Sequence, residues 1–297
     1  MARIHALLAA CVLAMAPLAA HAQNGCPNGG TVRFGVEPYE AAAQLIPIYN
    51  HIGDLIGSKI GCKVQVLITT NYTSEIEAMR SGKLEVGEFG PLGYVLAHQV
   101  AKAEAVATFG DKQGQPETYT AGIVTWPGTD IQTLKEVAGH TFAYSDPAST
   151  SGHLFPAYAL TQAGINPDTG VKAVYAGSHS ASFEALRNHK VQAGELNSQQ
   201  ITAATLAGSY KPGMFVQLWR SQPIPIDPIA IAPQLKDPFR AKLIDVLQHL
   251  DLSQLSPADL KILGTSGARL VPQTDAAYNG IRDLVHVLNI DLTKVSG

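Results

Sequence analysis

Residues 141–153 read Thr-Phe-Ala-Tyr-Ser-Asp-Pro-Ala-Ser-Thr-Ser-Gly-His, and this stretch contains the change of pattern that decides the fold. The first four residues form a short apolar run that is typical of a buried strand. Three consecutive hydroxyl residues, Ser149, Thr150 and Ser151, then stand where the first turn of a helix is expected. The segment therefore predicts a strand that ends in a polar loop and continues into a helix.

The same alternation of strands and helices extends in both directions from this segment. Toward the N-terminus it predicts strands at 31–36, 64–69 and 84–89 and helices near 41–56, 71–82 and 92–101. Toward the C-terminus it predicts a helix after Gly152, strands at 172–175 and 191–196, and a helix at 183–189. An S-x-x-E pattern at Ser74–Glu77 is typical of a helix cap. The fold class is therefore α/β, and the alternation favours mainly parallel sheets.

Two extended segments interrupt the alternation. Thr118–Trp126 is a long β-rich run, which we expect to be one strand passing from one lobe to another. We expect Phe215–Trp219 and the proline-rich Pro223–Pro228 to form the return crossing. The chain should thus form two βα lobes joined by two hinge crossings, with lobe 1 at 23–119 and 226–297 and lobe 2 at 120–225. A ligand would lie between the lobes, where strand ends and helix starts converge.

Composition excludes several classes of protein. The chain has 297 residues, 46% of them hydrophobic and 15% charged, which is typical of a compact soluble fold and not of a disordered or fibrous chain. Its 21 Lys and Arg against 24 Asp and Glu, with no basic run, give no electrostatic footprint for nucleic acid or for an anionic membrane surface. Nucleic-acid binding is therefore not expected.

The N-terminus has the pattern of an export signal. Residues 1–22 combine one charged side chain, Arg3, with an apolar stretch and a small-x-small site at Ala20–Ala22, which predicts a cleaved secretory signal peptide. The alternative is a lipoprotein anchored at Cys11, but only ten residues precede that cysteine. Cleavage leaves Cys26 and Cys62, an even pair in an exported protein, which predicts a disulfide. Two unpaired thiols are the alternative.

The hydroxyl run at 149–151 is suited to holding an anion. Free N–H groups at a helix start and the helix dipole favour negative charge, and side-chain hydroxyls add donors for a tetrahedral oxyanion. Helix capping is the alternative, but one hydroxyl would satisfy it. Gly152 follows directly and permits close approach to the backbone.

Four other side chains are candidates for the same site. Tyr72 and Tyr119 can donate through their phenols, and His179 through either ring nitrogen. Asp227, between two prolines, can accept from a ligand hydroxyl or ammonium group. Each has an ordinary alternative in packing, capping or turn formation, and the sequence alone does not bring them together. The chain has no HExxH or CxxC motif and no glycine-rich nucleotide fingerprint, so neither a metal nor a cofactor is expected.

Together these segments resemble the phosphonate-binding proteins of ABC importers, which are periplasmic clamps for phosphonates or phosphite. The most specific motif is D-P-x-S-T-S-G, here Asp146–Gly152. The supporting motifs are Asn71–Thr73 with Glu77–Arg80, Phe89–Leu92, Ala176–His179 and Pro225–Pro228. The resemblance implies a type II periplasmic binding-protein fold and an ABC permease as partner. It also implies that the oxyanion is held by Tyr72, Tyr119, Ser149, Thr150, Ser151 and His179.

One departure from the family bears on the ligand. Members similar to the receptors for 2-aminoethylphosphonate place two carboxylates against the ligand ammonium, and Asp227 matches one of them. The other position falls on Gln199, and losing that carboxylate should weaken ammonium recognition by roughly 1 to 3 kcal/mol. The ligand is therefore expected to be phosphite, a phosphate-like anion or a small alkylphosphonate. Glu195 lies close by in sequence, and the alternation does not settle whether it or Gln199 faces the pocket.

The expected mechanism is capture by lobe closure, in which a monomer binds a small oxyanion and no bond is made or broken. A periplasmic sensor subunit that binds a similar oxyanion is one alternative. A Ser-dependent hydrolase built from Asp146, Ser149 and His179 is a remote one, since no G-x-S-x-G elbow is present.

Overall fold

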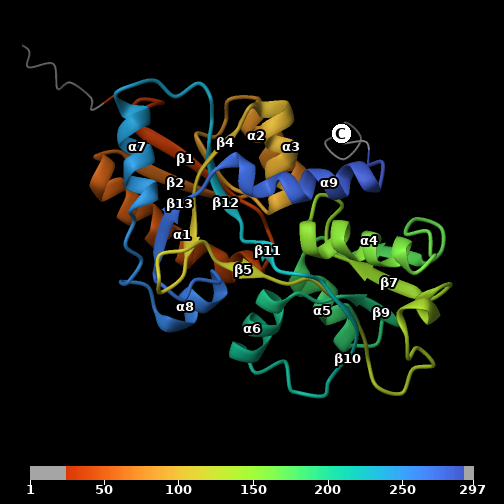
Figure 1. The fold of residues 1–297 in the computed structure, drawn as a ribbon. Coiled ribbons are helices and arrows are strands. Elements are labelled where there is room, and N and C mark those ends of the chain that lie inside the picture. Colours follow the sequence, from red (N-terminus) through yellow and green to blue (C-terminus); the bar gives the residue numbers. More distant parts are fainter. Residues whose placement is uncertain (1–24, 291–297) are drawn as a thin grey trace, which may run out of the picture.

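The computed structural model describes residues 25–290, which form two α/β lobes side by side (Figure 1). The predicted signal peptide at 1–22 and Cys11 lie outside the described residues. Lobe 1 is built on a six-stranded sheet and lobe 2 on a five-stranded sheet. Within residues 25–290, no helix is long and apolar enough to cross a membrane.

The sheet of lobe 1 joins strands from both ends of the chain. In spatial order its strands are β13 (Arg269–Pro272), β4 (Glu104–Gly110), β12 (Pro228–Ile231), β3 (Val86–Glu88), β1 (Thr31–Val36) and β2 (Lys63–Ile68). The helices and turns of this lobe are α1 (Ala42–Ile60), α2 (Tyr72–Arg80), α3 (Pro91–Ala101), α7 (Phe239–Gln248), α8 (Pro257–Ile262), the 3₁₀ turn η3 (Asp275–Tyr278) and α9 (Asn279–Val287). Fully buried Phe34, Ile52 and Leu243 belong to its core, which draws on β1, α1 and α7.

The sheet of lobe 2 has the spatial order β10 (Val216–Arg220), β6 (Gly122–Thr125), β9 (Ala193–Glu195), β7 (Thr141–Tyr144) and β8 (Lys172–Tyr175). Its helices are the 3₁₀ turn η1 (Leu134–Val137), the π-helical turn η2 (Thr150–Leu154), α4 (Phe155–Gln162), α5 (His179–Arg187) and α6 (Ser198–Leu206). The lobes are joined by the antiparallel pair β5 (Thr118–Tyr119) and β11 (Ile224–Pro225). The fold is the expected pair of βα lobes with two crossings, while the predicted boundaries at 119/120 and 225/226 stay a prediction.

The structure corrects the expectation of mainly parallel sheets. Strands separated by a helix pair in parallel, as β1 with β2 and β7 with β8 do. Each chain crossing, however, delivers strands that run the other way, so β12 is antiparallel to β3 and β4, and β6 is antiparallel to β9 and β10. Both sheets are therefore mixed.

Three expected elements differ from the structure. The run Thr118–Trp126 is two strands, because β5 pairs with the crossing strand β11 while β6 joins the sheet of lobe 2. Phe215–Trp219 was expected in the return crossing, but β10 is an edge strand of lobe 2. The cap of α2 is Asn71, whose side chain accepts the Ser74 N–H at 2.7 Å, so Ser74–Glu77 lies inside the helix and is not its cap.

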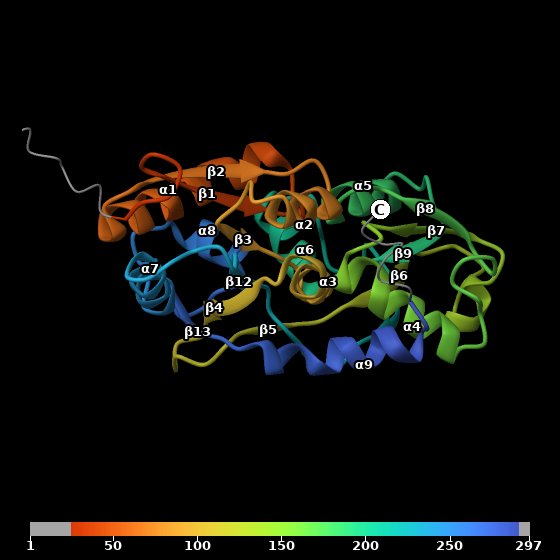
Figure 2. The ribbon, with the colours of Figure 1, turned by 90° about the horizontal axis from the view of Figure 1, so that it is seen from above.

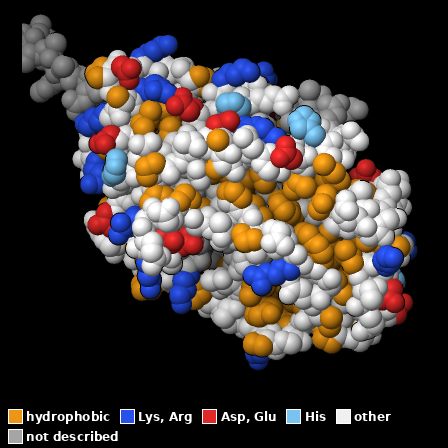
Figure 3. All heavy atoms as spheres, viewed as in Figure 1, with side chains coloured by type: hydrophobic (Ala, Val, Ile, Leu, Met, Phe, Trp, Pro, Cys, Tyr) orange, Lys and Arg blue, Asp and Glu red, His pale blue; other side chains and the backbone are white. Residues whose placement is uncertain are grey.

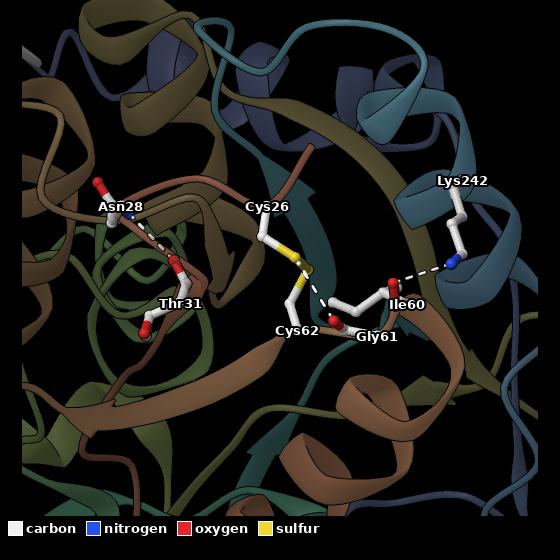
Figure 4. The surroundings of a disulfide bond; sticks show 7 residues. All are labelled: Cys26, Asn28, Thr31, Ile60, Gly61, Cys62 and Lys242. Atoms are coloured by element: carbon white, nitrogen blue, oxygen red, sulfur yellow. Dashed lines mark hydrogen bonds between the residues drawn. A yellow bond between two sulfur atoms is a disulfide. The ribbon is translucent and has the colours of Figure 1, made fainter. Parts of the chain in front are cut away.

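The predicted disulfide joins Cys26 to Cys62 and ties the segment before β1 to the turn between α1 and β2 (Figure 4). Next to it, Lys242 of α7 donates to the Ile60 carbonyl oxygen at 2.8 Å, which fixes the end of α1. Closing this loop of about 35 residues contributes on the order of 3 to 4 kcal/mol in the chain-entropy model.

The two lobes also touch outside the crossings. Helix α9 packs on α3 of its own lobe and reaches η2 of lobe 2, and both views place its C-terminal end beside α4 (Figures 1 and 2). Hydrophobic side chains gather over α9, α4 and β10 on the face shown in Figure 3, while charged side chains are more frequent over lobe 1. Ala148 and Leu154 of lobe 2 belong to the same buried apolar cluster as the core of lobe 1, so apolar packing joins the lobes in addition to the crossings.

Candidate functional site

A small cavity lies between the lobes, with about 20 Å³ open to the centre of a water-sized molecule. Lobe 1 contributes Glu37, Tyr39, Glu40, Tyr72, Gly90, Asp227 and Ile262, and the crossing contributes Tyr119. Lobe 2 contributes Ser149, Thr150, Ser151, His179, Asn197, Gln199 and Gln200. The structure thus brings all eight sequence-predicted site residues to one cavity.

The hydroxyl run lies where β7 has ended and η2 begins. Ser149 is the N-cap of η2, and its Oγ accepts the Gly152 N–H at 3.1 Å. Thr150 Oγ1 accepts the Leu92 N–H at 2.8 Å, and Ser151 Oγ accepts from Asn197 Nδ2 at 3.1 Å. A hydroxyl that accepts a hydrogen bond still has its own hydrogen to donate. Capping and anion binding are therefore compatible at this turn.

The two tyrosines approach the hydroxyl run from outside lobe 2. Tyr72 is the first residue of α2 and its phenol interacts with the Ser149 side chain, while the phenol of Tyr119 in β5 interacts with the side chains of Ser151 and Thr150. Burial, together with nearby carboxyl groups, raises the pKa of both phenols well above the ordinary value. Both phenols therefore stay protonated at neutral pH and can donate to an anion.

His179 is held between a hydroxyl and a carboxylate. Its Nε2 lies 3.3 Å from Ser149 Oγ, and its Nδ1 lies 2.9 Å from Glu195 Oε1. Burial alone would lower the pKa of His179, but the charges of Glu195 and Glu40 and the Glu195 hydrogen bond raise it overall. Asp146, considered above as a partner of His179, instead accepts the Ala148 N–H at 2.8 Å through Oδ1.

The choice between Glu195 and Gln199 is resolved by geometry. Gln199 lines the cavity, whereas Glu195 is bonded to His179 and is not among the lining residues. The alternation of side chains along a strand does not extend to Gln199, because Asn197 caps α6. Its Oδ1 accepts the Gln200 N–H at 2.7 Å. The side-chain period therefore changes from strand to helix between residues 195 and 199.

Sequence reasoning missed the lobe 1 segment Glu37–Glu40. It follows β1 directly, so the rule that polar residues at strand ends form sites would have found it. Glu37 Oε2 accepts the Gly90 N–H at 2.8 Å at the start of α3. Burial raises the pKa of Glu40 and of Asp227 to about 7, with His179 opposing the rise in both. The cavity thus has neutral donors on one side and carboxyl groups on the other.

No metal site accompanies this cavity in the part of the chain that the structure describes, where no grouping of His, Cys, Asp and Glu is arranged to hold a metal ion.

Fold and cavity define a two-lobed clamp of the kind that encloses a small polar solute. Residues 34–278 match the family model described as ABC transporter, phosphonate, periplasmic substrate-binding protein, and the chain belongs to this family. It is a family of periplasmic solute-binding components and not of enzymes, so the hydrolase alternative does not hold.

Curated relatives support this assignment across most of the chain. The phosphate-import protein PhnD of Mycolicibacterium smegmatis is 25% identical over 281 residues, which cover 89% of this chain and 88% of the relative. The phosphonates-binding periplasmic protein of Escherichia coli is 25% identical over 252 residues, covering 81% and 74%.

Solved structures agree with the fold. PhnD1 from Prochlorococcus marinus, in complex with methylphosphonate, has a TM-score of 0.76 at 21% identity and covers 88% of this chain and 99% of its own. A binding protein component of an ABC phosphonate transporter from Pseudomonas aeruginosa has a TM-score of 0.76 at 22% identity, with coverage of 88% and 87%. Both have the type II periplasmic binding-protein fold, which confirms the fold class predicted for this chain.

Proposed function

We propose that this protein captures phosphite, a phosphate-like anion or a small alkylphosphonate between its lobes and presents it to an ABC permease. The observation that carries the proposal is the convergence of three hydroxyls, two phenols and His179 on one cavity. All of these groups can donate a hydrogen bond, and a tetrahedral oxyanion accepts several at once. The ligands after which relatives are named, or with which they were solved, are phosphate, phosphonates, phosphite and methylphosphonate, and all belong to this chemical class.

Ser149, Thr150, Ser151, Tyr72, Tyr119 and His179 are the proposed oxyanion ligands, with Asp227 and Gln199 at the edge of the site. The donors come from both lobes, so a bound anion interacts with all of them only when the clamp is closed. Binding therefore favours the closed state, which is the state that a permease would recognise.

The ligand preference rests on Gln199. A neutral amide lines the cavity at the position where the resemblance calls for a carboxylate, so an ammonium group has one charged partner fewer there. Glu40 adds a carboxyl group elsewhere in the lining, and 2-aminoethylphosphonate is therefore the informative competitor.

We further infer that the mature protein is a monomer exported by cleavage after residue 22.

The test is calorimetric titration of refolded protein with phosphite, methylphosphonate, 2-aminoethylphosphonate, phosphate and sulfate. We expect tight binding of one phosphorus oxyanion and roughly tenfold weaker binding by Tyr72→Phe, which removes one donor to a charged ligand. Tyr175→Phe is the matched control, because Tyr175 of β8 is 45% exposed and is not a lining residue. Heat-silent titrations across the panel would refute the proposal, and preference for 2-aminoethylphosphonate would refute the role given to Gln199.

A further inference from the structure

Glu195 is a buried carboxylate that the capture mechanism does not use. It ends β9, its side chain is 1% exposed, and its Oε1 lies 2.9 Å from Nδ1 of His179. Its second oxygen, Oε2, has no hydrogen-bond partner among the described residues. Glu195 and His179 both belong to lobe 2, so their contact does not depend on closure of the clamp.

We propose that Glu195 is a positioning residue that fixes the His179 imidazole and, through it, determines whether the Ser149 hydroxyl hydrogen points toward the ligand. This inference rests on the proposed function, since it concerns how the same cavity receives an oxyanion.

The two ring nitrogens of His179 have different partners, Glu195 at Nδ1 and Ser149 at Nε2. An ionised carboxylate only accepts hydrogen bonds, so Nδ1 of His179 must carry a hydrogen that points to Glu195. A neutral His179 would then have a lone pair at Nε2, aimed at Ser149 Oγ 3.3 Å away. In that state Ser149 donates its hydrogen to the ring and has none for a ligand.

Protonation of Nε2 reverses this hydrogen bond. The ring then donates to Ser149 Oγ, which also accepts the Gly152 N–H at 3.1 Å. With both acceptor positions of Ser149 in use, its own hydrogen points away from the ring, toward the side of the cavity where the Tyr72 phenol oxygen or a bound anion accepts it. One proton on His179 therefore converts Ser149 from a donor to the ring into a donor to the anion.

Other titratable groups act in the same direction. Glu40 from the loop after β1, Asp227 from the segment between β11 and β12, and Asp146 after β7 all interact with the charge of His179. Glu40 and Asp227 belong to lobe 1 and add their effect when the clamp is closed. Glu195 is the one in hydrogen-bond contact with the ring, and a carboxylate at that distance favours the charged imidazole most strongly.

The test compares Glu195→Gln, which keeps a hydrogen-bonding side chain but removes the charge, with Glu184→Gln as matched control. Glu184 lies on the same helix as His179, but its side chain is 44% exposed and pairs with Arg187. Nitrogen NMR of the imidazole gives the titration midpoint and tautomer of His179 without ligand. Calorimetry with phosphite or methylphosphonate then gives affinity from pH 5.5 to 8.5.

We expect Glu195→Gln to lower the His179 midpoint and to weaken binding about tenfold or more above that midpoint. The ratio of its affinity to that of the wild type should return toward one as the pH is lowered below both midpoints, where the imidazole is charged in both proteins. Glu195→Asp retains the charge, so its His179 midpoint should lie between those of Glu195→Gln and the wild type. An unchanged midpoint, or an affinity ratio independent of pH, would overturn the inference. If the wild type bound no phosphorus oxyanion, the proposed function would be wrong. The effect of Glu195 on His179 would still be decided, because the NMR midpoint is measured without ligand.

Discussion

Gly152 is a residue on which the geometry of the proposed oxyanion site depends directly. A Cβ at this position would lie 1.7 Å from Ser145 Oγ, 2.7 Å from Ser145 Cβ and 2.9 Å from His179 Cε1. We expect Gly152→Ala to displace the turn that carries Ser149, to lower stability by about 1 to 3 kcal/mol and to abolish measurable phosphite binding. Urea unfolding and calorimetry test the two effects.

Gly280→Ala provides the control for that substitution. Gly280 lies in α9, and apart from its chain neighbours and the backbone of its own helix no heavy atom lies within 4 Å of an added Cβ, so alanine there should leave binding unchanged and stability equal or slightly higher. Wild-type affinity in Gly152→Ala would show that the turn tolerates a side chain, which contradicts the geometry described here.

The convergence of side chains on the cavity was predictable from the sequence where a strand end and a helix start coincide. Ser149–Ser151, Tyr72 and His179 all occupy such positions, and the ends of neighbouring strands converge in space. Partners of side chains were harder to predict. That Glu195 and not Asp146 contacts His179 depends on β9 lying beside β7, a pairing between segments about 50 residues apart.

The start of α3 contacts lobe 2 through one hydrogen bond, which we call the latch. The Leu92 N–H is one of the donors that a helix start leaves without an internal partner, and Thr150 Oγ1 accepts it across the cleft. Thr150→Val keeps the shape but removes the acceptor, leaving a buried N–H unsatisfied in the closed form at a cost of about 1 to 3 kcal/mol. We expect a lower closed fraction without ligand, measured by fluorescence transfer between labels on the two lobes. Thr150→Ser should behave like the wild type, and equal closure in Thr150→Val would show that the latch contributes nothing.

Elements were predictable where their own residues determine them and unpredictable where distant partners do. The strands 31–36, 141–144 and 172–175 agree with the structure to the residue, because short apolar runs flanked by turns are sufficient. Strand β4 was missed because its alanines, Ala105 and Ala107, are poor strand formers, and it is stabilised by pairing with β12 and β13. The antiparallel pairs were missed because their partners lie far apart in the sequence, as β4 and β12 or β6 and β9 do.

Lobe 1 buries more acidic than basic side chains. Glu37, Glu75 and Glu88 are at most 2% exposed, and burial raises the pKa of each well above 4.5, with neighbouring carboxyl groups adding to the rise. The folded protein therefore holds protons on these groups that the unfolded chain releases above about pH 4.5. Folding stability must then decrease as pH rises through this range.

We expect the free energy of unfolding to fall between pH 5.5 and 7.5, by about 1.4 kcal/mol per pH unit for each proton that the folded protein retains and the unfolded chain releases. Glu85 and Asp275 do not oppose this trend, because their pKa values are lowered and their contributions are lost only at more acidic pH. Glu75 is one of the three groups and does not line the cavity. Glu75→Gln removes its carboxyl group, so it should reduce the slope of the unfolding free energy against pH and raise that free energy at pH 7.5. Urea unfolding at both pH values measures the slope, with exposed Glu77→Gln on the same helix as control. A flat profile in the wild type, or an equal slope in Glu75→Gln, would mean that these carboxyl groups are ionised in the folded protein and that their burial is balanced by some other interaction.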